Sequence, residues 1–171
     1  MKQLTIGFSR AKGFKPFSWA IQKVLNTPFS HTYIKFKSDK FDRVLVYQAS
    51  GTAVNFMEEK RVLLTHEVIA EFELEISDEA YIKTVQFAID QSGVPYGISQ
   101  IFGILYVKAL GSFGKRVKNP FPNGNGNYIC SELVAQILKE IMDLKVDQDL
   151  DLITPKEVYE LLKTNKISET L

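Results

Sequence analysis

One segment near the C-terminal end has the spacing of a helix that must be buried along one side. Within residues 127–142, large apolar side chains recur every three or four positions and form one stripe: Leu133, Val134, Ile137, Leu138, Ile141 and Met142. Gly124 and Gly126 precede it and let the backbone bend sharply into the helix. A chain with such a segment must cover the stripe with other elements, so the segment predicts a helix packed in the core.

The only cysteine of the chain, Cys130, lies three residues before Leu133 and therefore on the same stripe, in the first turn. The first backbone N–H groups of a helix have no partner within it, and the helix dipole is positive there, so this position favours a thiolate. Cys130 is thus placed as a nucleophile. The alternative is a small buried hydrophobic residue, which is the commoner role of a lone cysteine.

Composition sets wide limits on the fold and on the partners. A length of 171 residues predicts a single domain, 1–171, and 45% hydrophobic with 24% charged residues is typical of a globular protein. A net charge of +1 indicates no nucleic-acid partner. One cysteine allows no intrachain disulfide. The N-terminus lacks the apolar core of a signal peptide, and the longest apolar region, 98–110, is too short to span a bilayer. We therefore expect a cytoplasmic protein without an integral membrane segment, or one exported by a non-classical route.

The periodicity along the chain predicts a mixed α+β domain. Residues 29–37 and 41–51 are rich in strand-forming residues and predict a hairpin, with His31 at the start of its first strand. Residues 66–76 alternate between apolar residues and glutamates, which indicates a half-buried strand with a solvated acidic face rather than a cation site. Helical spacing follows Pro16, Ser77, Gly97 and the capping box at Thr154. Residues 54–62 are mixed and predict no single element.

A thiol nucleophile needs a base, and the base needs an orienting group. The chain has two histidines. His66 begins the acidic-faced strand and is interpreted as a surface residue. In an antiparallel hairpin the start of one strand lies beside the end of its partner, so His31 and Gln48 are expected to be neighbours. The Gln48 amide oxygen can accept from one imidazole nitrogen and leave the other for the thiol. This predicts a catalytic set of Cys130, His31 and Gln48.

Other chemistries find little support in the sequence. There is no Gly-x-Ser-x-Gly elbow and no phosphate-binding glycine loop ending in lysine. Two histidines and one cysteine, widely spaced, do not form a zinc motif. Residues 147–151 resemble an incomplete calcium loop. We therefore expect neither a metal nor a cofactor. The glycine- and proline-rich segment 111–127, with a basic cluster at 115–118, is interpreted either as a lid beside the thiol or as a solvated loop.

The order of four motifs resembles the circularly permuted NlpC-type papain-like hydrolases, in particular the YiiX-like branch, with the lecithin:retinol acyltransferase-like enzymes as relatives. These motifs are Ser30-His31, the run 46–51 (Val-Tyr-Gln-Ala-Ser-Gly), the run 93–97 (Gly-Val-Pro-Tyr-Gly) and the run 128–134 (Tyr-Ile-Cys-Ser-Glu-Leu-Val). The later Ile153-Thr154-Pro155 also looks like that branch. The resemblance covers roughly residues 31–157, most of the chain.

The resemblance implies a permuted papain-like fold, in which an antiparallel sheet packs against a helix with the nucleophilic cysteine at its N-terminus. It implies that Cys130 is the nucleophile, His31 the base and Gln48 the third member, where the family often has glutamate. Tyr96 and Ser131 are expected at the substrate cleft.

The implied function is a cysteine peptidase or amidase that cleaves an amide or isopeptide bond. The substrate would be a peptide, a peptidoglycan fragment or an acylated small molecule. One alternative is a lipid acyltransferase or thioesterase with an acyl-binding wall of Phe102, Leu105, Tyr106 and Phe113. The other is a binding module on a degenerate hydrolase scaffold, because glutamine replaces glutamate.

Overall fold

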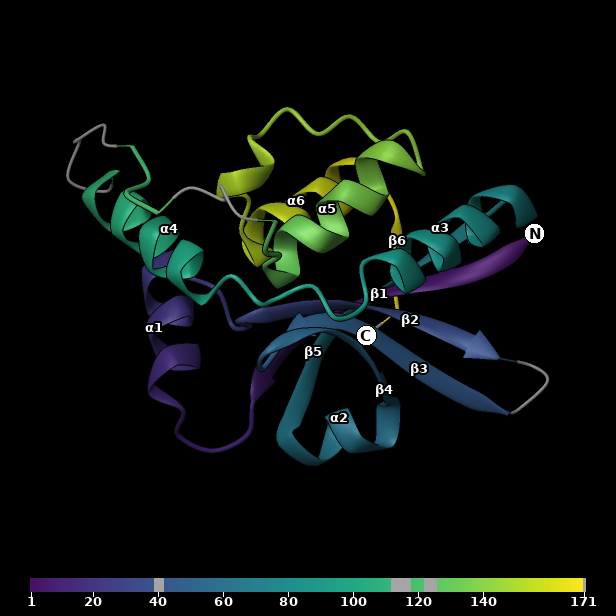
Figure 1. The fold of residues 1–171 in the computed structure, drawn as a ribbon, viewed down its shortest axis with the longest axis horizontal. Helices are drawn as coiled ribbons and strands as arrows, with labels where there is room; N and C mark the ends of the chain where they lie inside the picture. Colours follow the sequence, from purple (N-terminus) through teal and green to yellow (C-terminus); the bar gives the residue numbers. More distant parts are fainter. Residues whose placement is uncertain (39–41, 112–117, 122–125, 171) are drawn as a thin grey trace.

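A six-stranded antiparallel sheet forms the centre of the computed structural model, which describes residues 1–38, 42–111, 118–121 and 126–170 (Figure 1). The strand order is β4-β3-β2-β1-β5-β6. The strands are β1 (Lys2–Ala11), β2 (His31–Ser38), β3 (Arg43–Ser50), β4 (Ala53–Glu58), β5 (His66–Ile76) and β6 (Ser168–Glu169). The N-terminal strand therefore lies inside the sheet, between β2 and β5.

One face of the sheet carries the main core. Leu4, Ile6 and Phe8 of β1 are fully buried on it, because alternate residues of a strand point to the same face. Three helices lie on this side in Figure 1: α3 (Asp78–Asp90), α5 (Cys130–Glu140) and α6 (Pro155–Thr164). The apolar stripe of α5 packs here against β2 and β3, as the spacing in residues 127–142 predicts.

The other face is more polar and is covered in part by α2 (Glu59–Thr65). Tyr33, Val46 and Val62 form a small buried cluster there. Lys35 forms ion pairs with both Glu59 and Glu71 on this side. The predicted acidic face of residues 66–76 exists. It is not solvated throughout, because Glu71 is largely buried in its ion pair with Lys35.

Local sequence explains most of the element boundaries. α1 (Pro16–Leu25) begins with proline and ends at Asn26, which adopts φ 49°. The Ser77 side chain accepts a hydrogen bond from the N–H of Ala80 and caps α3. The predicted capping box of α6 is present in full, between Thr154 and Glu157. The mixed residues 54–62 hold β4 and most of α2, which follows β4 without a loop.

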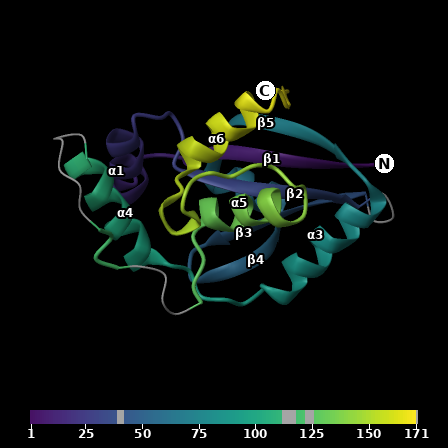
Figure 2. The same ribbon diagram turned by 90° about the horizontal axis from the view of Figure 1, so that it is seen from above.

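Two helices form an outlying part of the molecule. Both views show α1 and α4 (Ile98–Gly111) side by side at one end of the sheet (Figures 1 and 2). They pack through a separate apolar cluster that includes Ile21, Leu25, Ile101 and Ile104. In the described part of the chain, no helix combines the length and the apolarity needed to cross a bilayer. Most of the predicted lid at 111–127 lies outside the described residues.

Candidate active site

Cys130 is the first residue of α5, and the segments before it fix its position. The extended Ile129 precedes the helix without a side-chain cap, so the first N–H groups of α5 stay available. Tyr128 is held in a short bridge, because its N–H donates to Pro95 (3.1 Å) and its carbonyl accepts from Gly97 (2.9 Å). The thiol is only 5% exposed.

Several hydrogen-bond donors surround the sulfur. The backbone N–H groups of Thr32, Ser131 and Cys130 itself, together with the Tyr96 hydroxyl, lower the pKa of the thiol. Burial has the larger and opposite effect, so the pKa of Cys130 lies above its usual value. Burial likewise raises the pKa of Tyr96, and the nearby sulfur adds to that shift. The resting thiol is therefore protonated, at a place built to hold negative charge when it develops.

His31 and Gln48 form the hydrogen bond that the hairpin predicts. The distance between His31 Nε2 and Gln48 Oε1 is 2.8 Å, and both side chains are buried. Because the amide oxygen can only accept, Nε2 carries the proton and Nδ1 is left as the acceptor nitrogen of the neutral ring. Burial lowers the pKa of His31, and the contact with Gln48 offsets part of that effect. The imidazole is therefore neutral at pH 7.

The interpretation of His66 as a surface residue is wrong. Its ring lies 5.7 Å from the ring of His31, centroid to centroid, and it is half-buried. The two rings meet because β1 pairs with both strands: Ser9 lies opposite His31, and Ala11 lies opposite His66. Burial lowers the pKa of His66 to about 4, with a further contribution from His31. Only the register of the central strand could have shown this proximity.

The thiol and the His31 imidazole belong to opposite faces of the sheet. His31 shares its strand face with Tyr33, whereas α5 packs on the opposite face, where Ile34 points. The link between them is Thr32, whose N–H reaches the sulfur. Among the described residues, no hydrogen bond joins the thiol to the imidazole.

A narrow apolar cavity opens beside the thiol. Ile21 and Leu25 of α1, with Ile101, Ile104 and Leu105 of α4, line one side of it. Tyr96, Cys130 and Ser131 line the other, so the expected cleft residues Tyr96 and Ser131 both border it. Its volume is about 20 Å³, which is room for about one water molecule. A ligand larger than about one water molecule does not fit this cavity as it stands.

The predicted acyl-binding wall is present only in part. Leu105 lines the cavity, whereas Phe102 and Tyr106 are more than half exposed on the outer side of α4. Phe113 lies outside the described residues. The helical period explains the difference, because residues 101, 104 and 105 face inward while 102 and 106 face away.

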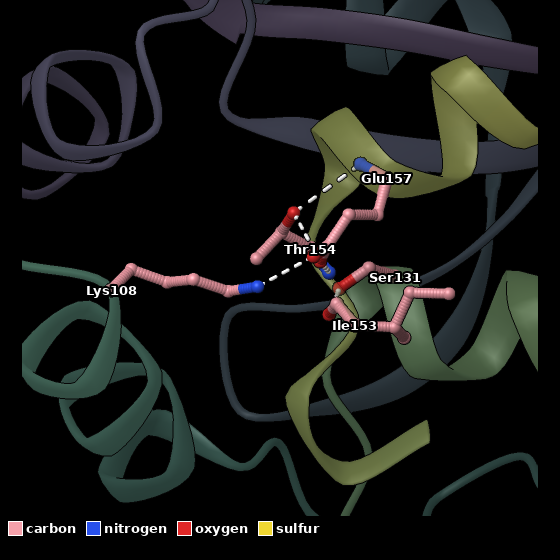
Figure 3. Close-up of polar contacts among 5 residues, drawn as sticks. All are labelled: Lys108, Ser131, Ile153, Thr154 and Glu157. Atoms are coloured by element: carbon pink, nitrogen blue, oxygen red, sulfur yellow. Dashed lines mark hydrogen bonds and ion pairs between the residues drawn. The ribbon is translucent and has the colours of Figure 1, made fainter. Parts of the chain in front are cut away.

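Polar contacts fix the segment before α6 against α5 and α4 (Figure 3). The Ser131 hydroxyl donates to the carbonyl of Ile153 at 2.7 Å and is buried. Its role is thus to hold this segment on α5. Thr154 caps α6, and Lys108 reaches across from α4 to pair with Glu157 at 2.5 Å. This ion pair joins the cavity wall in α4 to the helix that follows the site.

A buried carboxylate beside the cysteine is not among the predicted site residues. Glu132 lies in the first turn of α5, is 5% exposed and accepts a hydrogen bond from Gln100 Nε2 at 3.1 Å. A negative side chain in the first turn complements the helix dipole. The sequence signal was available, because an acidic residue two positions after the helix start is a common first-turn pattern.

The donor set does not fit a bound metal ion. Within the described ranges, no three His, Cys, Asp or Glu side chains gather closely enough to hold one. The two histidines come together, but Nε2 of His31 is already committed to Gln48. A third ligand that would complete a site on this pair is lacking among the described residues.

Comparisons with known proteins give one informative result. The sequence matches no protein-family model, and a search of curated proteins finds no match. Among solved structures, the chain is similar to the metalloprotein yiiX from Escherichia coli O157:H7, described as DUF1105. The TM-score is 0.56 and the sequence identity 20%, over 94% of this chain and 79% of that one. At this identity the likeness concerns architecture alone: the chain has a YiiX-like fold.

Proposed function

We propose that the protein is a thiol hydrolase that cleaves an amide or ester bond, with Cys130 as the nucleophile. The observation that carries the proposal is the ring of donors around the sulfur: three backbone N–H groups and the Tyr96 hydroxyl. Such donors stabilise the oxyanion of an acyl-transfer intermediate when they converge on the carbonyl oxygen.

His31 is the base in this proposal, and Gln48 is its positioning residue. The hydrogen bond to Gln48 fixes the tautomer in which Nδ1 accepts a proton. Since burial raises the pKa of the thiol and lowers that of the imidazole, the two groups rest in their neutral forms. The proton of Cys130 therefore moves to Nδ1 during attack, rather than beforehand, once the two side chains come within hydrogen-bond distance.

The reaction then follows two steps. The sulfur bonds to the carbonyl carbon, and the imidazolium gives its proton to the departing amine or alcohol as the carbon–heteroatom bond breaks. Water next attacks the thioester with His31 as base, which releases the carboxylic acid and restores the thiol. No step uses a metal, although yiiX is described as a metalloprotein, because the described donor set does not fit one.

The cavity wall favours an aliphatic acyl group as the substrate part beside Cys130. It is formed largely by isoleucine and leucine side chains of α1 and α4. An apolar acyl chain gains free energy by burial there, whereas the polar peptide of peptidoglycan leaves its amides without partners. A lipid thioesterase or acyltransferase is therefore the second candidate, on the same thiol.

Mass spectrometry of the intact protein tests the proposal. The protein is incubated with p-nitrophenyl esters and N-acyl amides of two to twelve carbons, and with a muropeptide. We expect an acyl adduct on Cys130, absent in Cys130→Ala. His31→Ala should lower turnover at least about 100-fold, because general-base catalysis contributes this much. The matched control is His66→Ala, which removes the neighbouring ring and should change turnover less than about tenfold.

Three results decide against the proposal. They are the absence of an adduct with every substrate, an adduct on another residue, and equal losses in His31→Ala and His66→Ala. The first would leave a binding module on this fold.

A further inference from the structure

The α1–α4 lobe, defined here as residues 12–26 together with α4, exposes large apolar side chains. Trp19 on α1 and Phe102 on α4 are 52% and 55% exposed, and Phe14 before α1 is 77% exposed. Isolated exposed apolar residues are normal, but several on two adjacent helices indicate a contact surface. In both views this lobe lies at one end of the molecule, away from most of the sheet (Figures 1 and 2).

The exposed residues of α4 follow one line along the helix. Ile98, Phe102 and Tyr106 are each about half exposed and are spaced four residues apart. Residues with this spacing lie above one another on one side of a helix. α4 is thus apolar on both sides, because Ile101 and Ile104 face the cavity. In the part of the chain that the structure describes, this outer side of α4 stays exposed and is available for contact with a partner.

Charge is strongly segregated along the chain. Residues 1–38 and 91–131 contain no Asp or Glu, although the chain has 20 of them, and they hold about half of its 21 Lys and Arg. Both helices of the lobe belong to these segments. Lys15 and Lys23 are exposed and have no acidic partner in the part of the chain that the structure describes. The net charge of +1 is thus the sum of a basic lobe and a slightly acidic remainder of the chain.

A basic groove lies beside Trp19. Arg10, Lys12 and Lys15 line it together with the indole, and its volume is about 350 Å³. One carboxylate, Glu67, also lines the groove and pairs with Arg10 at 2.9 Å. The groove therefore keeps a positive excess where an aromatic side chain is exposed.

We propose that the α1–α4 lobe docks on the surface of an anionic lipid bilayer, with Trp19 and the Ile98–Phe102–Tyr106 line at the level of the headgroups. Tryptophan and tyrosine favour this level, and lysines beside them attract anionic lipids. A nucleic acid would use the same lysines and aromatic rings, but it offers no apolar medium for Ile98 and Val24, which are also exposed. The inference goes beyond the proposed function and does not depend on Cys130 chemistry.

The experiment uses Trp19 as its own reporter, because it is the only tryptophan of the chain. The full-length protein is mixed with vesicles of phosphatidylcholine and phosphatidylglycerol at 3:1, and with vesicles of phosphatidylcholine alone. Docking should shift the fluorescence to shorter wavelength, and brominated lipids should quench it. Cosedimentation should show binding that weakens with salt, since screening reduces the attraction.

Two pairs of variants locate the surface. Lys15→Glu with Lys23→Glu should weaken binding at least about 25-fold, because each lysine near an anionic surface contributes about fivefold. Lys139→Glu on the exposed end of α5 is the control and should change binding less than about threefold. Phe102→Ser should lower binding roughly tenfold, whereas Leu64→Ser on α2, where the side chain is 77% exposed, should not.

Several outcomes overturn the proposal: no binding to anionic vesicles, equal binding to neutral ones, or equal effects of the lobe and control variants. Self-association that Phe102→Ser abolishes in the absence of lipid would assign the surface to a second copy. Tighter binding to an RNA oligonucleotide than to vesicles would also refute it. Cys130→Ala should bind vesicles like the wild type, so failure of the hydrolase proposal and failure of docking are distinguishable.

Discussion

Replacing Gln48 by glutamate should reverse the charge state of His31 at neutral pH. In the wild type the amide oxygen lies 2.8 Å from Nε2, and burial holds the pKa of His31 below 6.5. A carboxylate at this distance favours the imidazolium by up to about 6 kcal/mol, at an effective dielectric constant of about 20. Desolvation of the new carboxylate offsets part of this. We expect a net rise of at least about 2 pKa units, to above about 7.

The measurement is a pH titration of the histidine ring protons by NMR. With only two histidines in the chain, the spectrum contains two sets of imidazole signals. His66 serves as the internal reference, and its pKa of about 4 should fall further in Gln48→Glu, because the neighbouring ring becomes charged. Gln48→Leu is the matched control: it removes the hydrogen bond that raises the pKa of His31, so this pKa should fall below the wild-type value.

A His31 pKa that stays the same in both variants would refute the contact between the two side chains. The same result would also refute the role of Gln48 as a positioning residue for His31. A pKa that rises in Gln48→Glu while turnover increases would instead show that the wild-type pair is a weakened version of a histidine–carboxylate pair.

Three further outcomes are expected. His66 is protonated near pH 6.5 in the unfolded chain and only near pH 4 in the folded chain. Lowering the pH from 7.5 to 4 should therefore reduce the free energy of unfolding, measured with urea, by about 1–3 kcal/mol. The variant His66→Gln should lose much less. Gly7→Ala places a Cβ 2.2 Å from the buried Tyr33 ring, so it should destabilise the folded protein by about 2–4 kcal/mol. The second substitution Tyr33→Leu should relieve this clash. Gly111→Ala is the control, because a Cβ there meets open space. Iodoacetamide should alkylate Cys130 with a pH midpoint above that of free cysteine, and Tyr96→Phe should raise it further; a midpoint below free cysteine would contradict the dominance of burial.

The alternating patterns predicted which segments are strands better than they predicted which strands lie side by side. Strand periodicity is a local property, and it predicted the hairpin that joins His31 to Gln48 as well as the strand at 66–76. The place of β1 between β2 and β5 is a long-range property that no local pattern encodes. The contact between His31 and His66 depends entirely on it, which is why a surface position for His66 was the natural but wrong expectation.

The sequence indicated which residues belong to the candidate site better than it indicated how their side chains lie relative to one another. The start of α5 at Cys130 and the border of Tyr96 on the cavity agree with the sequence signals. The face of the sheet to which His31 belongs depends on the alternation of residues along β2. The face to which Cys130 belongs depends on which side of the sheet α5 covers. Whether the three residues act together remains a prediction, which the adduct and titration experiments test.

The α1–α4 lobe carries four lysines and no Asp or Glu, whereas the rest of the chain has more acidic than basic residues, so positive charge is concentrated at one end of the molecule. A charged surface then exerts a torque on the molecule before any contact forms, within roughly a Debye length of about 8–10 Å. If the lobe docks as proposed, an anionic surface attracts the lobe and repels the rest of the chain, which favours one orientation of approach. A chain whose total charge is only +1 can thus be directed electrostatically without being attracted strongly from afar.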